Sequence, residues 1–309
     1  MIAGNALGWW GVPLAVVAGA IRVSTPFLFV SLGETVTEKS GRINLGLEGI
    51  LMMGAMTAYA LSYRWGSPWM GVFCAALVGA LFGLLHALIC SLPKVNDIAV
   101  GIALMLFGTG MAFFLGAPYV APQAPGLPVM HLGAWSNVPQ LRAALDVNIL
   151  FPIGIAAALW LSWGFKSTGA GLIVRMVGDN AEAARSMGYP PNRVRLAATA
   201  FGGFMAGIGG SFLSLSYPGS WNEGLSSGQG IMAVALVIFA RWNPVNCIWA
   251  SLLFGGAGAL GPALQSVGIT QGYYLFNAAP YLLTLAIMIA FCSPNRTLAG
   301  APGELSITK

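Results

Sequence analysis

Residues 69–92 read WMGVFCAALVGALFGLLHALICSL and contain no charged side chain. A helix needs about 20 mainly apolar residues to cross the hydrocarbon core of a bilayer, so this stretch is long enough to span one. Similar stretches fill most of the chain, and charged residues make up 7% of its 309 positions, against roughly 25% in soluble domains. The sequence therefore predicts a membrane protein with lipid around much of its surface.

The fold class that these stretches predict is all-α, a polytopic bundle of about 8–10 transmembrane helices that forms one domain over residues 1–309. The clearest candidate spans are 12–32, 45–63, 69–92, 98–120, 149–165, 196–217 and 273–293, and two weaker ones are 229–240 and 245–262. Glycine or proline interrupts many of them, which favours close helix packing and broken helices.

The basic residues divide unequally between the two sides of the membrane that about nine spans would define. If the 166–195 loop is cytoplasmic, that side collects Lys39, Arg42, Lys94, Lys166, Arg175, Arg185, Arg193, Arg195, Arg241, Arg296 and Lys309. The other side has Arg64 and Arg142, and Arg22 lies within the first span. Because basic residues concentrate in cytoplasmic loops, this bias predicts that the N-terminus is outside. The net charge of +5 is spread thinly, so it does not indicate nucleic-acid binding.

A faint internal repeat links two distant segments of the chain. Residues 44–50 read NLGLEGI, residues 222–231 read NEGLSSGQGI, and each opens an apolar segment that ends in Arg-Trp. In the orientation above, the two copies start on opposite faces, as in the inverted repeats of many transporters, whose substrate path lies between the repeats. This argument makes Asn44, Glu48, Asn222 and Glu223 candidates for the translocation path. Shared composition among glycine-rich helices is the alternative explanation.

Charged side chains inside a membrane are costly and usually face a partner or a water-filled path. Arg22 and Glu48 lie within or near apolar spans, and Glu34 and Glu38 are close enough in sequence to share one depth. Two interpretations are open. These residues either line the path or form an Arg–Glu pair that fixes helix packing, and we favour the packing interpretation.

The residue pattern does not support an enzyme. The two histidines, His86 and His131, lie far apart, and no cluster has metal-ligand spacing, so neither a catalytic residue nor a metal site is predicted. Residues 224–228 match Gly-x-Ser-x-Gly around Ser226, but neither a strand-to-helix turn nor a histidine partner is indicated. No lysine follows a glycine, so the chain lacks a phosphate-binding loop, and we expect it to bind no ATP or other cofactor itself.

The 166–195 loop predicts a short cytoplasmic helix over residues 181–187. Asp179 or Asn180 provides its cap, the following residues are good helix formers, and Gly188 with the two prolines after Tyr189 ends it. The helix is either a connector between spans or a docking element for a soluble motor, and composition alone does not choose between these roles.

A resemblance to a known family enters at this loop. Residues 178–188 resemble the coupling loop of permease subunits in binding-protein-dependent ABC importers for ribose-type sugars, nucleosides and branched-chain amino acids. A sharper match is LGE at 32–34 followed by EKSGRINLGLEG at 38–49, which is similar to the nucleoside and simple-sugar permeases of that family. Sugar-specific relatives typically have a Gly-Ile-Asp-Leu-Ser-like sequence where this chain has RINLG at 42–46. The resemblance covers most of the chain.

The resemblance implies the permease subunit of an ABC importer in the bacterial cytoplasmic (inner) membrane, which carries a nucleoside-like or simple-sugar solute inward. It implies a second permease subunit, ATP-binding subunits that hydrolyse the ATP, and an extracytoplasmic substrate-binding protein as partners, with membrane lipid around them. The ATPase-coupling residues that it assigns are Gly178, Asp179, Asn180, Ala183, Ala184, Arg185 and Gly188. Branched-chain amino acids or another small solute are alternatives within this importer type. An ion-coupled secondary transporter, with Glu48 as its lone candidate carboxylate, is the alternative outside it.

Overall fold

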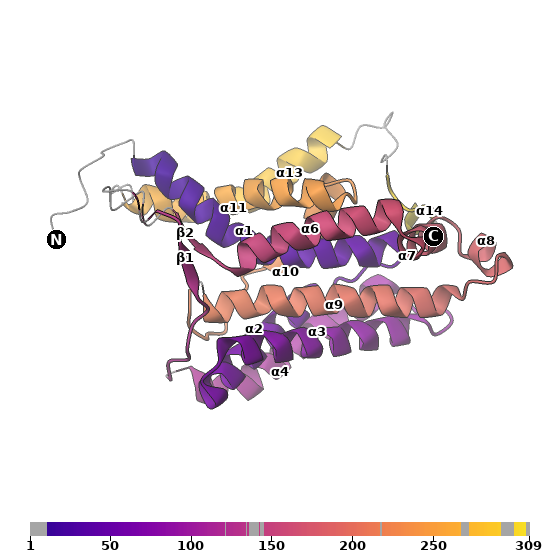
Figure 1. Ribbon diagram of the computed structural model, residues 1–309, viewed down its shortest axis with the longest axis horizontal. Coiled ribbons are helices and arrows are strands. Elements are labelled where there is room, and N and C mark those ends of the chain that lie inside the picture. Colours follow the sequence, from indigo (N-terminus) through magenta and orange to yellow (C-terminus); the bar gives the residue numbers. More distant parts are fainter. Residues whose placement is uncertain are drawn as a thin grey trace.

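The computed structural model describes residues 11–120, 122–133, 135, 142, 145–216, 218–266, 272–291 and 300–306, which form an elongated helical bundle (Figure 1). The helices are α1 (Gly11–Lys39), α2 (Leu47–Trp65), α3 (Pro68–Cys90), α4 (Asp97–Gly116), the 3₁₀ turn η2 (Ala117–Tyr119), α6 (Leu150–Ser167), α7 (Gly169–Asp179), α8 (Ala181–Ser186), α9 (Pro191–Leu215), α10 (Gln229–Phe239), α11 (Pro244–Ser266), α12 (Tyr273–Asn277), α13 (Ala279–Phe291) and α14 (Gly303–Ser306). Two short antiparallel strands, β1 (Val129–His131) and β2 (Asp146–Asn148), are a small exception to the all-α prediction.

Six helices among the described residues are long and apolar enough to cross a membrane, namely α1, α3, α4, α6, α9 and α11. The chain is therefore a polytopic helical membrane protein, as the sequence predicts. The predicted spans 45–63 and 229–240 correspond to α2 and α10, which begin inside the bundle. The predicted span 273–293 is divided between α12 and α13, because Pro280 prevents one helix from continuing through it.

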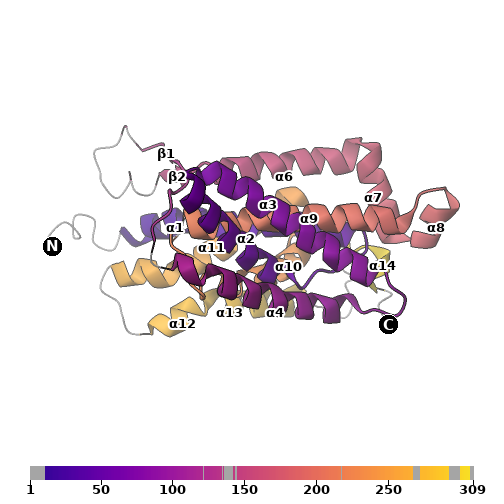
Figure 2. The same cartoon turned by 90° about the horizontal axis from the view of Figure 1, so that it is seen from below.

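The bundle has two ends (Figures 1 and 2). We call one the α8 end, where α8, α14 and the last turn of α1 lie, and the other the sheet end, where β1 and β2 lie. The α8 end collects Lys39, Arg42, Lys94, Lys166, Arg175, Arg185, Arg193, Arg195 and Arg241. Arg64 and Arg142 lie toward the sheet end, while Arg296 and Lys309 lie outside the described residues. This distribution is the reason to expect the α8 end in the cytoplasm.

Corresponding helices of the two halves of the chain run in opposite directions. α1 and α3 run from the sheet end to the α8 end, whereas α9 and α11 run back, as Figures 1 and 2 show. α3 packs along α9, α1 packs along α11, and α1 and α9 also contact each other. α2 and α10 both start inside the bundle and run toward opposite ends. This arrangement supports the inverted repeat that the sequence indicates.

Glycines allow the helices of the two halves to approach closely. A Cβ atom added at Gly79 of α3 would overlap the backbone oxygen of Gly203 in α9, and one added at Gly203 would overlap the oxygen of Gly79. Small residues have this role in membrane bundles, where helices gain van der Waals contact by close packing. The α3–α9 contact therefore depends on both positions.

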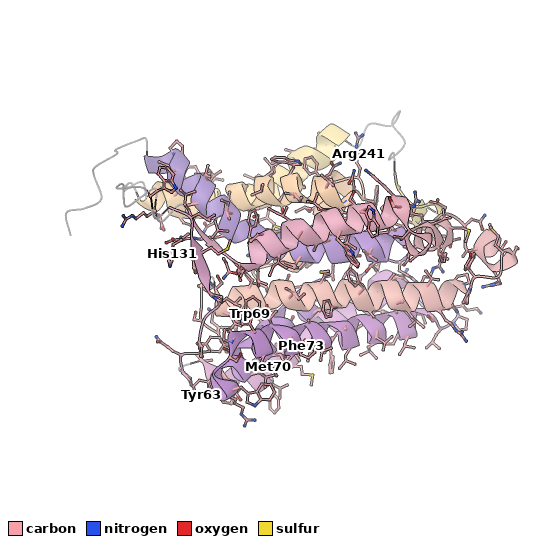
Figure 3. The ribbon with its side chains drawn as sticks, viewed as in Figure 1. Tyr63, Trp69, Met70, Phe73, His131 and Arg241 are labelled. Carbon is pink, nitrogen blue, oxygen red and sulfur yellow. The ribbon has the colours of Figure 1, made fainter. Side chains whose placement is uncertain are left out.

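Aromatic side chains gather toward the sheet end of α2 and α3 (Figure 3). Tyr63, Trp69 and Phe73 are exposed on the chain's surface, and the apolar side chain of Met70 is exposed among them. Tyrosine and tryptophan concentrate at the headgroup level of membrane proteins, where one end of the ring is apolar and the other is hydrated. Their position agrees with a membrane boundary near the sheet end.

Candidate functional site

Two helices, α2 and the short α10, meet inside the bundle with their N-termini together. α2 follows the non-helical segment 40–46, which comes back from the α8 end, and α10 follows the non-helical segment 218–228, which enters from the sheet end. A Cβ atom added at Gly230 would lie 2.6 Å from the Cα of Glu48, so the first turns touch. The first N–H groups of a helix have no partner within it and carry the positive end of its dipole. Two such ends therefore converge at this junction.

The carboxylate of Glu48 satisfies this junction. Its Oε1 accepts hydrogen bonds from the Ser226 hydroxyl at 2.5 Å and from the Gly228 N–H at 2.9 Å, and its Oε2 accepts one from the Gly230 N–H at 2.6 Å. Glu48 is buried in the first turn of α2, so its negative charge complements the positive ends of both helices. The favoured packing interpretation of Glu48 is supported, with α10 as the partner in place of an arginine.

Ser226, the centre of the Gly-x-Ser-x-Gly match, belongs to this junction. Its side chain is buried and donates to Glu48, and the segment around it leads into a helix without a preceding strand. The nucleophile elbow that this motif marks in hydrolases exposes its serine hydroxyl on a strand-to-helix turn and pairs it with a histidine. The geometry therefore gives Ser226 a structural role that the sequence pattern did not reveal.

The four predicted path residues separate into two pairs. Asn44 is fully buried, its N–H donates to Glu34 Oε1 at 2.8 Å, and its Oδ1 accepts from the Gly46 N–H at 2.9 Å, so with Glu48 it shapes the entry into α2. Asn222 and Glu223 are exposed in the segment that leads to α10. The structure brings Glu48 to residues 226–230 of the second repeat, and a role in the path stays a prediction for all four.

The segment 40–46 is held at the α8 end through Arg42. Its Nη1 lies 2.5 Å from Asp97 at the start of α4, and its Nη2 donates to the Cys90 carbonyl at 2.6 Å at the end of α3. Just before the segment, Glu38 in the last turns of α1 accepts from the indole N–H of Trp242, which follows α10. Arg42 therefore fixes the segment that leads to Glu48 against α3 and α4, and the Glu38 contact joins the end of α1 to the residues after α10.

The loop between α6 and α9 forms two helices rather than one. Thr168 caps α7 by accepting from the Gly171 N–H at 3.1 Å, and Asn180 caps α8 by accepting from the Ala183 N–H at 2.9 Å. Gly188, with φ of 88°, ends the turn that follows α8, and α9 starts at Pro191. The predicted cap, helix and stop of α8 are confirmed, whereas α7 was not expected. α8 is the part of the bundle farthest from the sheet end (Figure 1).

The predicted coupling residues differ in exposure. Those that are exposed at the α8 end are Asp179, Asn180, Ala183, Arg185 and Gly188. Gly178 and Ala184 are buried, and a Cβ atom added at Gly178 would overlap the carbonyl oxygen of Lys39. The exposed residues provide a surface, and Gly178 lets the end of α7 pack against the end of α1. Coupling to an ATPase stays a prediction for this set.

Sequence reasoning missed two residues that hold this loop. Glu304 of α14 accepts from the Ala181 N–H and pairs with Arg195 of α9, which lies at the α8 end. Glu304 stands more than one hundred positions from both partners, and no local pattern marks it.

Comparisons with known proteins show what the chain is similar to. Residues 7–292 match the family model described as "Branched-chain amino acid transport system / permease component". A putative glucose ABC transporter permease protein of Haloferax volcanii is 29% identical, over 87% of this chain and 88% of its own length. A nucleoside ABC transporter permease protein of Lactococcus lactis subsp. cremoris is 28% identical, over 89% and 92% of the two chains. A guanosine ABC transporter permease protein of Bacillus subtilis is also 28% identical, over 89% and 91%.

Proposed function

Because the chain belongs to the family of permease components of branched-chain amino acid transport systems, we propose that it is the membrane subunit of an ABC importer for a nucleoside or a simple sugar. The relatives named for nucleoside, guanosine and glucose transport match most of the chain, and they favour these solutes over branched-chain amino acids. Solute moves inward across the bacterial cytoplasmic membrane along a path that two permease subunits form together.

The observation that carries the proposal is α8. This short capped helix is exposed at the basic end of the bundle, and it connects directly to α7 and α9. A separate ATP-binding subunit docks on it, since the sequence contains no Gly-Lys pair with which this chain would hold phosphate. An extracytoplasmic binding protein delivers the solute at the sheet end.

Uptake of radiolabelled guanosine and glucose tests the proposal in a strain that lacks the gene. We expect the strain to lose uptake of one of the two solutes and the wild-type gene to restore it. A gene for the Ala183→Arg variant should not restore uptake, because the added side chain enlarges the exposed face of α8 and obstructs docking. Immunoblotting of membranes must show equal amounts of the wild-type protein and the Ala183→Arg variant. Normal uptake with Ala183→Arg contradicts docking at α8, and unchanged uptake of both solutes in the deletion strain contradicts the solute classes.

A further inference from the structure

The C-terminal helix α14 lies against the α8 end of the bundle, beside α7, in both Figures 1 and 2. A Cβ atom added at Gly303 would overlap the carbonyl oxygen of Asp179, the last residue of α7. The contact is therefore backbone against backbone, and it places the next residue, Glu304, at the start of α8.

Glu304 joins α8 to α9 through its two carboxylate oxygens. Oε1 accepts the Ala181 N–H at 2.9 Å, and Oε2 accepts from Arg195 Nη2 at 3.0 Å. Ala181 opens α8, where Asn180 already accepts the Ala183 N–H, so a residue distant in sequence completes the cap of this helix. The side chains of Arg195 and Glu304 are 12% and 25% exposed, which shields the pair from most of the solvent.

Arg195 extends the connection to the segment that enters the membrane. Its Nε donates to the Ser40 carbonyl at 3.1 Å, directly after the end of α1. Gly41 follows with φ of 84°, and a Cβ atom there would lie 2.9 Å from Glu304 Cβ and 3.2 Å from Arg195 Nη2. The backbone of segment 40–46 is thus packed directly against the ion pair, and this segment leads to Glu48.

We propose that Glu304 is a positioning residue that ties the ATPase-docking helix α8 to α9 and to segment 40–46, so that displacement of α8 is passed to α2. The inference rests on the proposed function for the source of that displacement. A cap that only stabilised α8 would need the Ala181 contact alone, whereas the contacts with Arg195 and Gly41 connect α8 to the part of the chain that holds the central junction.

Transport in liposomes tests this role in the complete transporter, with both permease subunits, the ATP-binding subunits and the binding protein. The readout is labelled guanosine or glucose accumulated per ATP hydrolysed. We expect Glu304→Gln to lower this ratio by about fivefold, the lower end of coupling between distant sites, with ATP hydrolysis retained. Arg195→Gln should have the same effect and the double variant no greater one, because both act through one connection. Arg193→Gln, which removes an exposed charge nearby, should leave the ratio unchanged.

Hydrogen–deuterium exchange of the purified chain tests the connection independently of transport. We expect Glu304→Gln to increase exchange in both α8 and segment 40–46, with no change in the part of α3 nearest the sheet end. Increased exchange in α8 alone, or an unchanged transport ratio in an active complex, overturns the inference. If wild-type liposomes hydrolyse ATP but accumulate neither solute, the proposed solutes fail, and the exchange result still decides the role of Glu304.

Discussion

The oxygens of Glu48 meet three donors that all come from residues 226–230, and the Gly230 N–H is bonded to the oxygen that the other two do not use. The sequence identified Glu48 as unusual because it is a charged residue in an apolar region. It did not identify the donors, since Ser226 stands 178 positions away and the pairing depends on how the halves pack. The sequence did not identify the role of Glu304 either, because its partners are also far away in the chain.

Substituting Glu48 with glutamine tests the junction at the residue scale. The amide keeps one acceptor oxygen but presents an N–H₂ group to a donor of α10, so one buried hydrogen bond is replaced by two opposed donors. We expect the free energy of unfolding to fall by about 1–3 kcal/mol. Thermal unfolding of the detergent-solubilised protein measures the change. Glu223→Gln, at an exposed position, should stay within about 0.5 kcal/mol of wild type.

At the scale of elements, local signals predicted some helices and missed others. Asn180, the alanines that follow and Gly188 are enough to define α8 from the sequence. α7 opens with Gly169 and Gly171, whose low helix propensity hides its start. α2 reads as a full span because its apolar residues are continuous, and its start inside the bundle depends on contacts with α10 that no local pattern encodes.

The α3–α9 contact makes the element-scale prediction. Alanine is a better helix former than glycine by roughly 0.5–1 kcal/mol. At Gly110 in α4, no atom of a neighbouring element lies within 4 Å of an added Cβ, so Gly110→Ala should keep or raise stability. At Gly79 the added methyl group overlaps the Gly203 carbonyl, and overpacking costs about 1–3 kcal/mol, which outweighs that gain. We therefore expect Gly79→Ala to lower the melting temperature. Equal melting temperatures for the two variants contradict the close approach of α3 and α9.

At the scale of the whole molecule, corresponding helices of the two halves run in opposite directions and pack against each other across the bundle. The helical bundle followed from composition, and the concentration of basic residues toward one end followed from their placement in the sequence. How α1 packs along α11 and α3 along α9 did not follow, because these contacts join positions far apart in the chain, and glycines at their crossings are as common elsewhere in the sequence.

Orientation in the membrane is the prediction at this scale. Cysteine introduced at Ala183, in α8, should react with a membrane-impermeant maleimide in inside-out vesicles, and cysteine introduced at Leu132, beside β1, should react in right-side-out vesicles. Both positions are exposed. The parent protein provides the background from its native cysteines, of which Cys90 and Cys247 are buried. The reverse labelling pattern contradicts the assignment of the α8 end to the cytoplasm.

The junction at Glu48 also has a consequence for how the protein is made. The ribosome completes α2 long before it reaches residues 226–230, so the carboxylate enters the membrane while its three donors do not yet exist. A buried carboxylate without partners is costly in lipid. We therefore expect the first half to reach its final packing only after α10 has emerged, and a nascent chain stalled after Leu215 to be recognised and degraded by membrane proteases.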